Sequence, residues 1–297
     1  MKEAVVALGT FDGVHLGHKR ILSDAVSYAK KHGLKSIAVT FNPHPQQIII
    51  PERGLKLLTT LSERKELINA LGVDEVITIK FTTGFQKLSY KEFAGKYLVK
   101  KIKAAVVFAG YDFAFGHNRS GGVDQLKNLG REFGFKVKIV KPVKETVPAG
   151  RQEKHIVKSS LIRNLISRGN FNHAIHLLGH PFQITGRVIH GVGRGGGLGF
   201  HTANLKIENH KLLPQHGVYL GKTLGRKCVV NIGARPTFGS GSVEIEAHIL
   251  NFSKNIYGKK IKLQLYKKIR DEIQFNDVEE LKERIRKDID ILKRYVI

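Results

Sequence analysis

The 297-residue sequence is short of the residues that build disulfide frameworks and membrane spans. It has one cysteine, one methionine and no tryptophan. The single cysteine, Cys228, excludes a disulfide within the chain and any metal site built from several cysteines. No segment approaches the roughly 18 consecutive apolar residues of a membrane-spanning helix. The first residues form too short an apolar stretch for a secretory signal, and we expect a cytoplasmic protein that does not contact a membrane.

Acidic residues are also scarce. Asp and Glu number 25 against 50 Lys and Arg, which gives a formal net charge of +25. Such a surface attracts polyanions, and both nucleic acid and nucleoside triphosphates would be drawn to it. Charge therefore leaves a nucleic-acid-binding protein and an enzyme for anionic substrates open, although no RNA-binding signature accompanies it.

The length favours two domains, each large enough to bury a core. The first half alternates β and α patterns, and most of its helical segments end at a glycine such as Gly33 or Gly134. This alternation predicts an α/β domain with a doubly wound parallel sheet. The expected strands are 4–8, 36–41, 73–79, 104–109 and 137–140, and the expected helices are 16–32, 62–71, 89–102 and 121–133.

The pattern changes near Pro181. Two short helical segments, 159–168 and 171–178, precede the change, and short β-type runs separated by glycines follow it. An amphipathic helix at about 277–295 closes the chain. We predict domains 1–180 and 181–297, the second a small β-barrel, or a sandwich, with the last helix as a cover. Its expected strands are 183–190, 203–207, 217–224, 227–232, 243–252 and 260–266.

The stretch GTFDGVHLGH (9–18) lies where the first strand passes into the first helix. A glycine-rich turn at the carboxyl edge of a parallel sheet is where such folds bind ligands, and the N–H groups of a helix start favour phosphate. His15 and His18 lie three residues apart and can face one ligand, while Gly17 lets a phosphate approach the backbone. The stretch predicts a triphosphate cradle. The alternative is that both histidines cap and pack a turn.

This His-x-Gly-His pattern resembles the nucleotidylyltransferase superfamily. Together with TFNPHP (40–45), GYDFAFG (110–116) and KSSLIRNLI (158–166), it resembles the FMN adenylyltransferase module of prokaryotic bifunctional riboflavin kinase/FAD synthetases. A lysine, Lys158, stands where the last motif usually has a serine. The resemblance implies catalytic roles for His15, His18 and Arg163, ATP binding by Gly9, Phe11, Gly17, Ser159 and Ser160, and flavin binding by Asn42, Tyr111, Asp112 and Phe113.

Simpler roles stay open for several of these residues. Ser159 and Ser160 can cap a helix, and Arg163 can be a solvated helix residue. His44 can bind its own loop backbone rather than ATP. The aromatic side chains of Tyr111, Phe113 and Phe115 can belong to the core rather than stack on flavin.

Two stretches in the second half match nucleotide-binding motifs only in part, and we reject both. The glycines at 191–196 match a dinucleotide fingerprint but no helix follows, and GVYLGKT (217–223) is one residue too short between its glycines for a P-loop. The order of a glycine-rich flap, HTAN (201–204), NIGARPTF (231–238) and a Glu-x-His strand resembles the riboflavin kinase module instead. This implies ATP binding by Gly191, Gly193, Gly199, Thr202 and Asn204, Mg²⁺ held by Thr202 and Asn204, Glu246 as the base for the riboflavin 5′-hydroxyl, and Arg270 beside the flavin.

Here too, alternatives and departures remain. Glu246 can be an exposed strand residue, because Glu244 shares its face, and Arg270 can join a surface charge cluster with Asp271 and Glu272. Gly196 replaces a common arginine of the flap, His201 the usual proline and Asn251 the usual aspartate.

The resemblance implies a bifunctional enzyme. Riboflavin and ATP give FMN and ADP in the second module, and FMN and a second ATP give FAD and pyrophosphate in the first. Both reactions require Mg²⁺, and FMN and FAD bind as products. The alternatives are a nucleotidylyltransferase with another acceptor and an inactive second domain, or a basic nucleic-acid-binding protein on this fold. The oligomeric state is left open.

Overall fold

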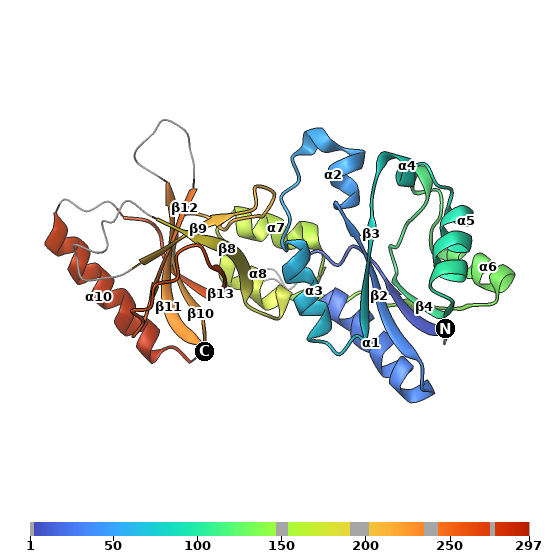
Figure 1. Ribbon diagram of the computed structural model, residues 1–297, viewed down its shortest axis with the longest axis horizontal. Helices are drawn as coiled ribbons and strands as arrows, with labels where there is room; N and C mark the ends of the chain where they lie inside the picture. Colours follow the sequence, from blue (N-terminus) through green and yellow to red (C-terminus); the bar gives the residue numbers. More distant parts are fainter. Residues whose placement is uncertain (1–2, 147–153, 191–201, 235–242, 274–276, 297) are drawn as a thin grey trace. The chain divides into compact units, whose positions relative to one another are not determined.

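The computed structural model describes residues 3–146, 154–190, 202–234, 243–273 and 277–296. The chain forms two compact units (Figure 1). The first consists of Met1–Leu57 and Leu61–Ser159, and the second of Leu58–Thr60 and Ser160–Ile297. The helices at 159–178 thus group almost entirely with the second unit, whereas the sequence pattern assigns them to the first domain.

The first unit contains the predicted parallel sheet. Its five strands lie in the order β3-β2-β1-β4-β5, and every neighbouring pair is parallel. All five residues of the central strand β1 are buried, because helices cover both faces of a parallel sheet. The strands are β1 (Ala4–Leu8), β2 (Lys35–Asn42), β3 (Glu75–Lys80), β4 (Ala104–Gly110) and β5 (Lys136–Val140).

Two hydrophobic cores form on the two faces of this sheet. The helices α1 (Leu16–His32) and α3 (Leu61–Asn69) supply one, and α5 (Tyr90–Phe93), with its π-helical continuation Ala94–Lys101, and α6 (Val123–Phe133) supply the other. Helix α1 ends at Gly33, whose φ of 65° is the left-handed conformation that glycine adopts without strain. The shorter elements are α2 (Pro45–Ile49), Pro51–Arg53, α4 (Thr83–Gln86), His117–Arg119, and the hairpin of β6 (Lys144–Thr146) and β7 (Lys154–Ile156).

The order of the strands creates a switch point between β1 and β4. The chain leaves β1 toward β2 on one side, and β4 lies on the other side of β1. In open α/β sheets, ligands bind in the crevice outside the carboxyl ends of the strands at such a point. The turn after β1 and the loop after β4 therefore mark the expected site.

The second unit is a closed six-stranded barrel with the strand order β10-β11-β12-β9-β8-β13. Closure confirms the predicted barrel and excludes the sandwich. Inward side chains alternate along each strand, as in β12, where Ile245, Ala247 and Ile249 are buried. The elements of this unit are α7 (Ser159–Ser167), α8 (Phe171–Leu178), β8 (Phe182–Ile189), β9 (Thr202–Ile207), β10 (Gly217–Thr223), β11 (Arg226–Ala234), β12 (Val243–Ile249), β13 (Lys260–Arg270) and α10 (Val278–Arg294).

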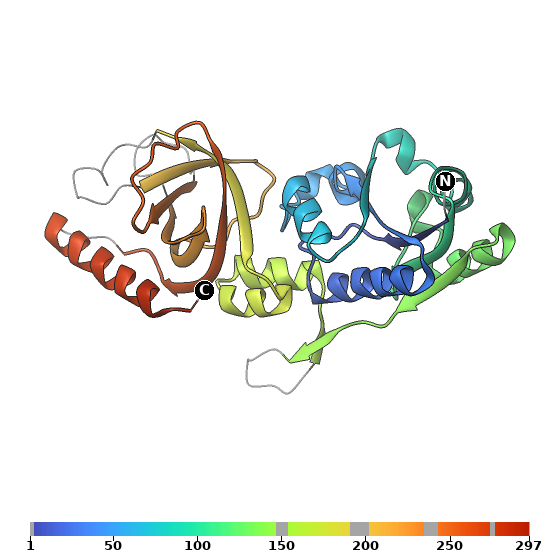
Figure 2. The same ribbon diagram turned by 60° about the horizontal axis from the view of Figure 1, so that its bottom comes forward.

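Helix α10 lies along the barrel, as both views show (Figure 2). Ile289 and Leu292 on α10 pack against Val218, Leu220 and Val229 of β10 and β11. Asp277 caps the start of the helix by accepting a hydrogen bond from Glu280 N at 2.8 Å. The predicted covering helix is thus confirmed.

Candidate active sites

The turn after β1 is strained in a way typical of functional sites. Phe11 and Val14 adopt φ values of 51° and 39°, in the left-handed region that side chains rarely enter. Val14 is β-branched, which makes its conformation a genuine outlier, and such strain clusters where a ligand is held. Both side chains are fully buried, so the packing around them maintains the turn.

His15 and His18 project from the end of this turn. His15 caps α1, because its Nδ1 accepts a hydrogen bond from His18 N at 3.3 Å. The two imidazole rings stack, with centroids 3.7 Å apart and planes inclined by 19°. The capping alternative is therefore correct for His15, but the stack also places both rings together at the start of α1, where N–H groups favour an anion.

Gly17 is needed for a reason that the sequence did not predict. A Cβ atom at this position would lie 3.1 Å from the His15 ring and 3.4 Å from the carbonyl oxygen of Val157. Glycine therefore leaves room for the His15 ring, and the 157–159 segment lies at ordinary van der Waals distance from this position.

The segment before α7 joins the same region. Ser159 Oγ donates a hydrogen bond to the carbonyl oxygen of Asp12 at 2.8 Å, across 147 residues of sequence. In the same region, a Cβ at Gly110 would lie 3.5 Å from Asp112 Oδ1 and equally close to Ile21 of α1. The histidine turn, the loop after β4 and Ser159 thus converge at the switch point.

The loop after β4 divides its aromatic residues between two environments. Phe115 is buried in the core and stacks on Phe113 at 5.2 Å, so the core alternative is correct for Phe115. Tyr111 and Asp112 face Lys158, whose Nζ lies 3.5 Å from Asp112 Oδ2 and 5.6 Å from the centroid of the Tyr111 ring. The sequence did not assign Lys158 to the site, although its departure from the serine motif was a signal.

Four other residues predicted for this site either make backbone contacts near their own segment or belong to the second compact unit. Asn42 ends β2, and its carbonyl oxygen accepts a hydrogen bond from Phe81 N at 3.1 Å. His44 caps α2 and accepts from Gln46 N at 3.2 Å, which is the backbone role considered for it. Ser160 and Arg163 follow Ser159 in α7, in the second compact unit.

The barrel brings three predicted kinase residues together on neighbouring strands. Glu246 of β12 pairs in register with Asn204 of β9, and His248 pairs with Thr202. With its amide oriented to suit its neighbours, Asn204 Nδ2 donates to Glu246 Oε1 at 3.1 Å and to Glu244 Oε1 at 3.0 Å. Asn204 therefore holds both carboxylates.

This donor set suits Mg²⁺. Hydroxyl, amide and carboxylate oxygens are the ligands that magnesium prefers, and it is usually bound through few protein groups together with substrate phosphates. Within the described parts of the chain, no group of three or more His, Cys, Asp or Glu side chains forms a metal cluster. Gly191, Gly193, Gly196, Gly199 and His201 lie outside the described residues.

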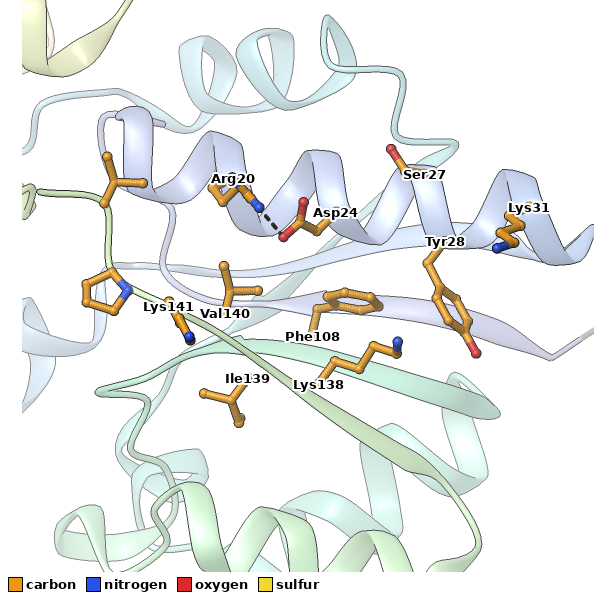
Figure 3. A pocket seen from close by; sticks show the side chains of 12 residues that line it. Arg20, Asp24, Ser27, Tyr28, Lys31, Phe108, Lys138, Ile139, Val140 and Lys141 are labelled. Atoms are coloured by element: carbon orange, nitrogen blue, oxygen red, sulfur yellow. Dashed lines mark hydrogen bonds and ion pairs between the residues drawn. The ribbon is translucent and has the colours of Figure 1, made fainter.

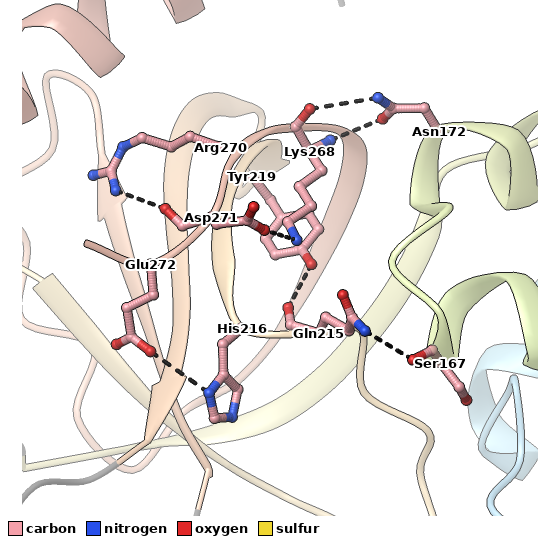
Figure 4. A network of polar contacts seen from close by, with 9 residues as sticks. All are labelled: Ser167, Asn172, Gln215, His216, Tyr219, Lys268, Arg270, Asp271 and Glu272. Atoms are coloured by element: carbon pink, nitrogen blue, oxygen red, sulfur yellow. Dashed lines mark hydrogen bonds and ion pairs between the residues drawn. The ribbon is translucent and has the colours of Figure 1, made fainter.

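Arg270 has an internal partner that the sequence did not predict. Its Nε lies 3.1 and 3.0 Å from the two carboxylate oxygens of Asp288 on α10, and Nη2 lies 2.7 Å from Oδ2. Both side chains are largely buried, with exposed fractions of 12% and 2%. Asp271 instead pairs with Lys268 and Glu272 with His216 (Figure 4). The surface cluster considered as an alternative for Arg270 is therefore divided, and Arg270 anchors the covering helix.

A separate open hollow of about 900 Å³ lies between α1 and the edge strand β5 (Figure 3). Lys31, Lys138 and Lys141 line it, and Arg20 is paired there with Asp24 at 3.0 Å. None of the predicted site residues borders it. Part of the positive charge of the chain therefore lines this hollow beside α1.

Comparisons with known proteins divide the chain into two matched segments. A family model described as FAD synthetase matches residues 1–149, and one described as riboflavin kinase matches residues 178–296. A relative from Buchnera aphidicola (Schizaphis graminum) is 36% identical over 98% of this chain and 94% of its own length. A relative from Bacillus subtilis is also 36% identical, over 99% and 92%. Both are named bifunctional riboflavin kinase/FMN adenylyltransferase.

The fold also matches a solved structure. A crystal structure described as a macrolide-efflux protein from Streptococcus pneumoniae aligns with a TM-score of 0.86 and 30% identity, over 99% of this chain and 95% of that one. Among the described residues of this chain, no helix is both long and apolar enough to cross a membrane. The two family models and the near-full-length relatives establish that the chain belongs to the family of bifunctional riboflavin kinase/FMN adenylyltransferases.

Proposed function

We propose that the chain converts riboflavin to FMN in its barrel and FMN to FAD in its α/β unit, as its family membership supports. One observation supports the assignment of one reaction to each unit: each matched segment contains its own candidate site. The stacked His15 and His18 lie within residues 1–149, and the Asn204–Glu246 pair lies within residues 178–296. The predicted domains 1–180 and 181–297 would each carry one reaction.

In the adenylylation step, a phosphate oxygen of FMN attacks the α-phosphorus of ATP, and the bond to the pyrophosphate leaving group breaks. The protein needs no nucleophile, so its contribution is positioning and charge stabilisation. His15 and His18 would stabilise the negative charge on the phosphates at the start of α1, where helix N–H groups add to the effect.

The other residues of this unit would position the two substrates. Ser159 connects the segment before α7 to the histidine turn through Asp12, and the loop after β4 borders the same crevice. We assign ATP to Gly9, Phe11, Gly17, Ser159, Ser160 and Arg163, and the flavin to Asn42, Tyr111, Asp112 and Phe113.

In the phosphorylation step, Glu246 would accept the proton of the riboflavin 5′-hydroxyl while its oxygen attacks the γ-phosphorus of ATP and ADP leaves. Asn204 Nδ2 holds the Glu246 carboxylate from 3.1 Å, which fixes the orientation of the base. Thr202 and Asn204 would hold Mg²⁺, which neutralises phosphate charge when it is bound. The internal contacts of Arg270 favour a structural role over direct flavin binding.

The test is to incubate the purified chain with riboflavin, ATP and Mg²⁺ and to separate the flavins by chromatography, with a parallel reaction started from FMN. We expect FMN and then FAD in the first reaction, FAD in the second, and neither product when EDTA replaces Mg²⁺. FAD formation only from FMN would refute the kinase assignment. Conversion in neither reaction would refute both assigned activities and favour another acceptor or the polyanion-binding alternative.

The use of ATP in both proposed steps supports a cytoplasmic location.

A further inference from the structure

The backbone of Lys158 borders the histidine turn, and its ammonium group stands where the motif at 158–166 usually has a serine hydroxyl. Lys158 lies between Val157, whose carbonyl oxygen approaches Gly17, and Ser159, whose hydroxyl donates to Asp12. Val157 N also donates to Val143 O at 2.9 Å. The backbone of Lys158 is therefore fixed on both sides against the turn that presents His15 and His18.

The ammonium group of Lys158 is directed across the switch point toward the loop after β4. It lies 3.5 Å from Asp112 Oδ2, and these two side chains are half-exposed, at 46% and 56%. The nearby Tyr111 hydroxyl, followed by the Asp112 carboxylate, raises the pKa of Lys158 above its ordinary value. The group is thus a permanent cation at neutral pH, in contact with solvent in the crevice.

The contact with Asp112 is one that a ligand can replace. An ion pair between exposed side chains is weak in water, because both charges remain solvated. A phosphate group offers more negative charge and more acceptor oxygens than a single carboxylate, so it competes well for an ammonium group. The Lys158–Asp112 pair then keeps the ammonium in place until a phosphate arrives.

We propose that the ammonium of Lys158 binds a phosphate oxygen of a substrate in the adenylyltransferase site, leaving Asp112 when the substrate enters. This inference rests on the proposed function of the α/β unit. Phosphate is carried by both ATP and FMN, and the position of Lys158, between the histidine turn and the Tyr111–Asp112 loop, gives it access to either. Asp112 is a positioning residue in this scheme.

The experiment compares Lys158→Met, Lys158→Arg and wild type in FAD formation, with ATP and FMN varied in turn. We expect Lys158→Met to raise the KM of the phosphate-bearing partner about tenfold, with a smaller change in kcat, as for the loss of one charge-assisted contact. A rise confined to ATP identifies the triphosphate as the ligand, and one confined to FMN identifies the flavin phosphate. Arginine should restore most of the lost affinity, because it keeps the charge.

Lys35→Met is the matched control. Lys35 forms an ion pair with Glu75 at 2.6 Å, with exposed fractions of 50% and 45%, but it begins β2 and so lies at the amino edge of the sheet. This variant should leave both KM values unchanged, and the conversion of riboflavin to FMN should stay unchanged in all three variants.

Two results would overturn the proposal. One is unchanged KM values for ATP and FMN in Lys158→Met. The other is a loss of FAD formation that arginine does not restore, since a structural role would give that result. A wild-type chain that forms no FAD from FMN would instead refute the proposed function itself, so the two failures are distinguishable.

Discussion

The Arg270–Asp288 pair allows a direct measurement of what holds α10 on the barrel. Asp288 is almost fully buried and receives three short contacts from the Arg270 guanidinium, between 2.7 and 3.1 Å. The change Asp288→Ala removes the carboxylate and leaves a largely buried guanidinium without its charged partner. The apolar contacts of Ile289 and Leu292 with the barrel would remain, so we expect α10 to loosen.

The expected cost follows from the burial of the pair. Removing one partner of a buried ion pair destabilises a protein by about 3–5 kcal/mol, because the other charge stays desolvated. For a domain of roughly 100 residues, each kcal/mol lowers the unfolding midpoint by about 4–8 °C. The kinase unit of Asp288→Ala should therefore unfold at least about 12 °C below that of the wild type.

The assay is the thermal inactivation midpoint of each reaction, riboflavin to FMN and FMN to FAD, on the same full-length chain. The first midpoint should fall and the second should change little. Glu283→Ala is the control on the same helix, because Glu283 pairs with Lys287 at 2.7 Å but both side chains are more than 60% exposed, at 66% and 62%. Its midpoints should match the wild type, since exposed pairs add little. An Asp288→Ala midpoint equal to that of the control would refute the reasoning.

Three further predictions concern the two sites and the pH dependence of the first unit. The change His18→Ala should lower FAD formation from FMN by about 10²–10³-fold, as the loss of a charge-stabilising group does, and leave FMN formation intact; equal loss of both activities would contradict separate sites. Glu246→Gln should lower FMN formation from riboflavin by about 10²–10⁴-fold and spare FAD formation from FMN; normal FMN formation would eliminate Glu246 as the base. Hydrogen bonds from the Ser36 hydroxyl and N–H hold the pKa of Asp74 below its ordinary value of 3.8. The ionised Asp74 therefore stabilises the folded state above about pH 4, and this contribution is lost as the pH falls further. Urea unfolding at pH 6 and pH 3 should show a smaller decrease in the free energy of unfolding for Asp74→Asn than for the wild type. Equal decreases would contradict this.

The secondary structure was predictable wherever the apolar residues of a long segment repeat at one regular spacing. The expected helix 16–32 is observed with the same limits, because its apolar positions repeat at helical spacing and Gly33 ends it. The strand expected at 260–266 extends to Arg270, since pairing with β10 continues to that residue. Helix α2 and the β6–β7 hairpin were not predicted, because segments of three to five residues contain less than two full periods of their element.

A motif that is compact in sequence allowed a prediction of site chemistry. The turn from Gly9 to His18 is local, so its residue types and spacing already indicate a phosphate-binding helix start. The stacking of His15 on His18 and the strain at Val14 depend on packing and were not predictable. The same holds for the kinase residues: the family resemblance implies a role as base for Glu246, which stays a prediction, but only the strand register and side-chain geometry show that Asn204 contacts its carboxylate.

The sequence by itself determined the α/β and barrel folds and the family, because these depend on periodicity and on motifs whose order can be followed along the chain. The tertiary structure alone decided the partners of charged residues. Asp288, 18 residues from Arg270, makes that arginine an anchor for α10, and Asp112, on the loop after β4, pairs with the Lys158 ammonium from the segment before α7. Ion pairs and hydrogen bonds require distances of a few ångströms in space. The separation of two residues along the sequence does not give their distance in the folded chain, so these partners could not be predicted from the sequence.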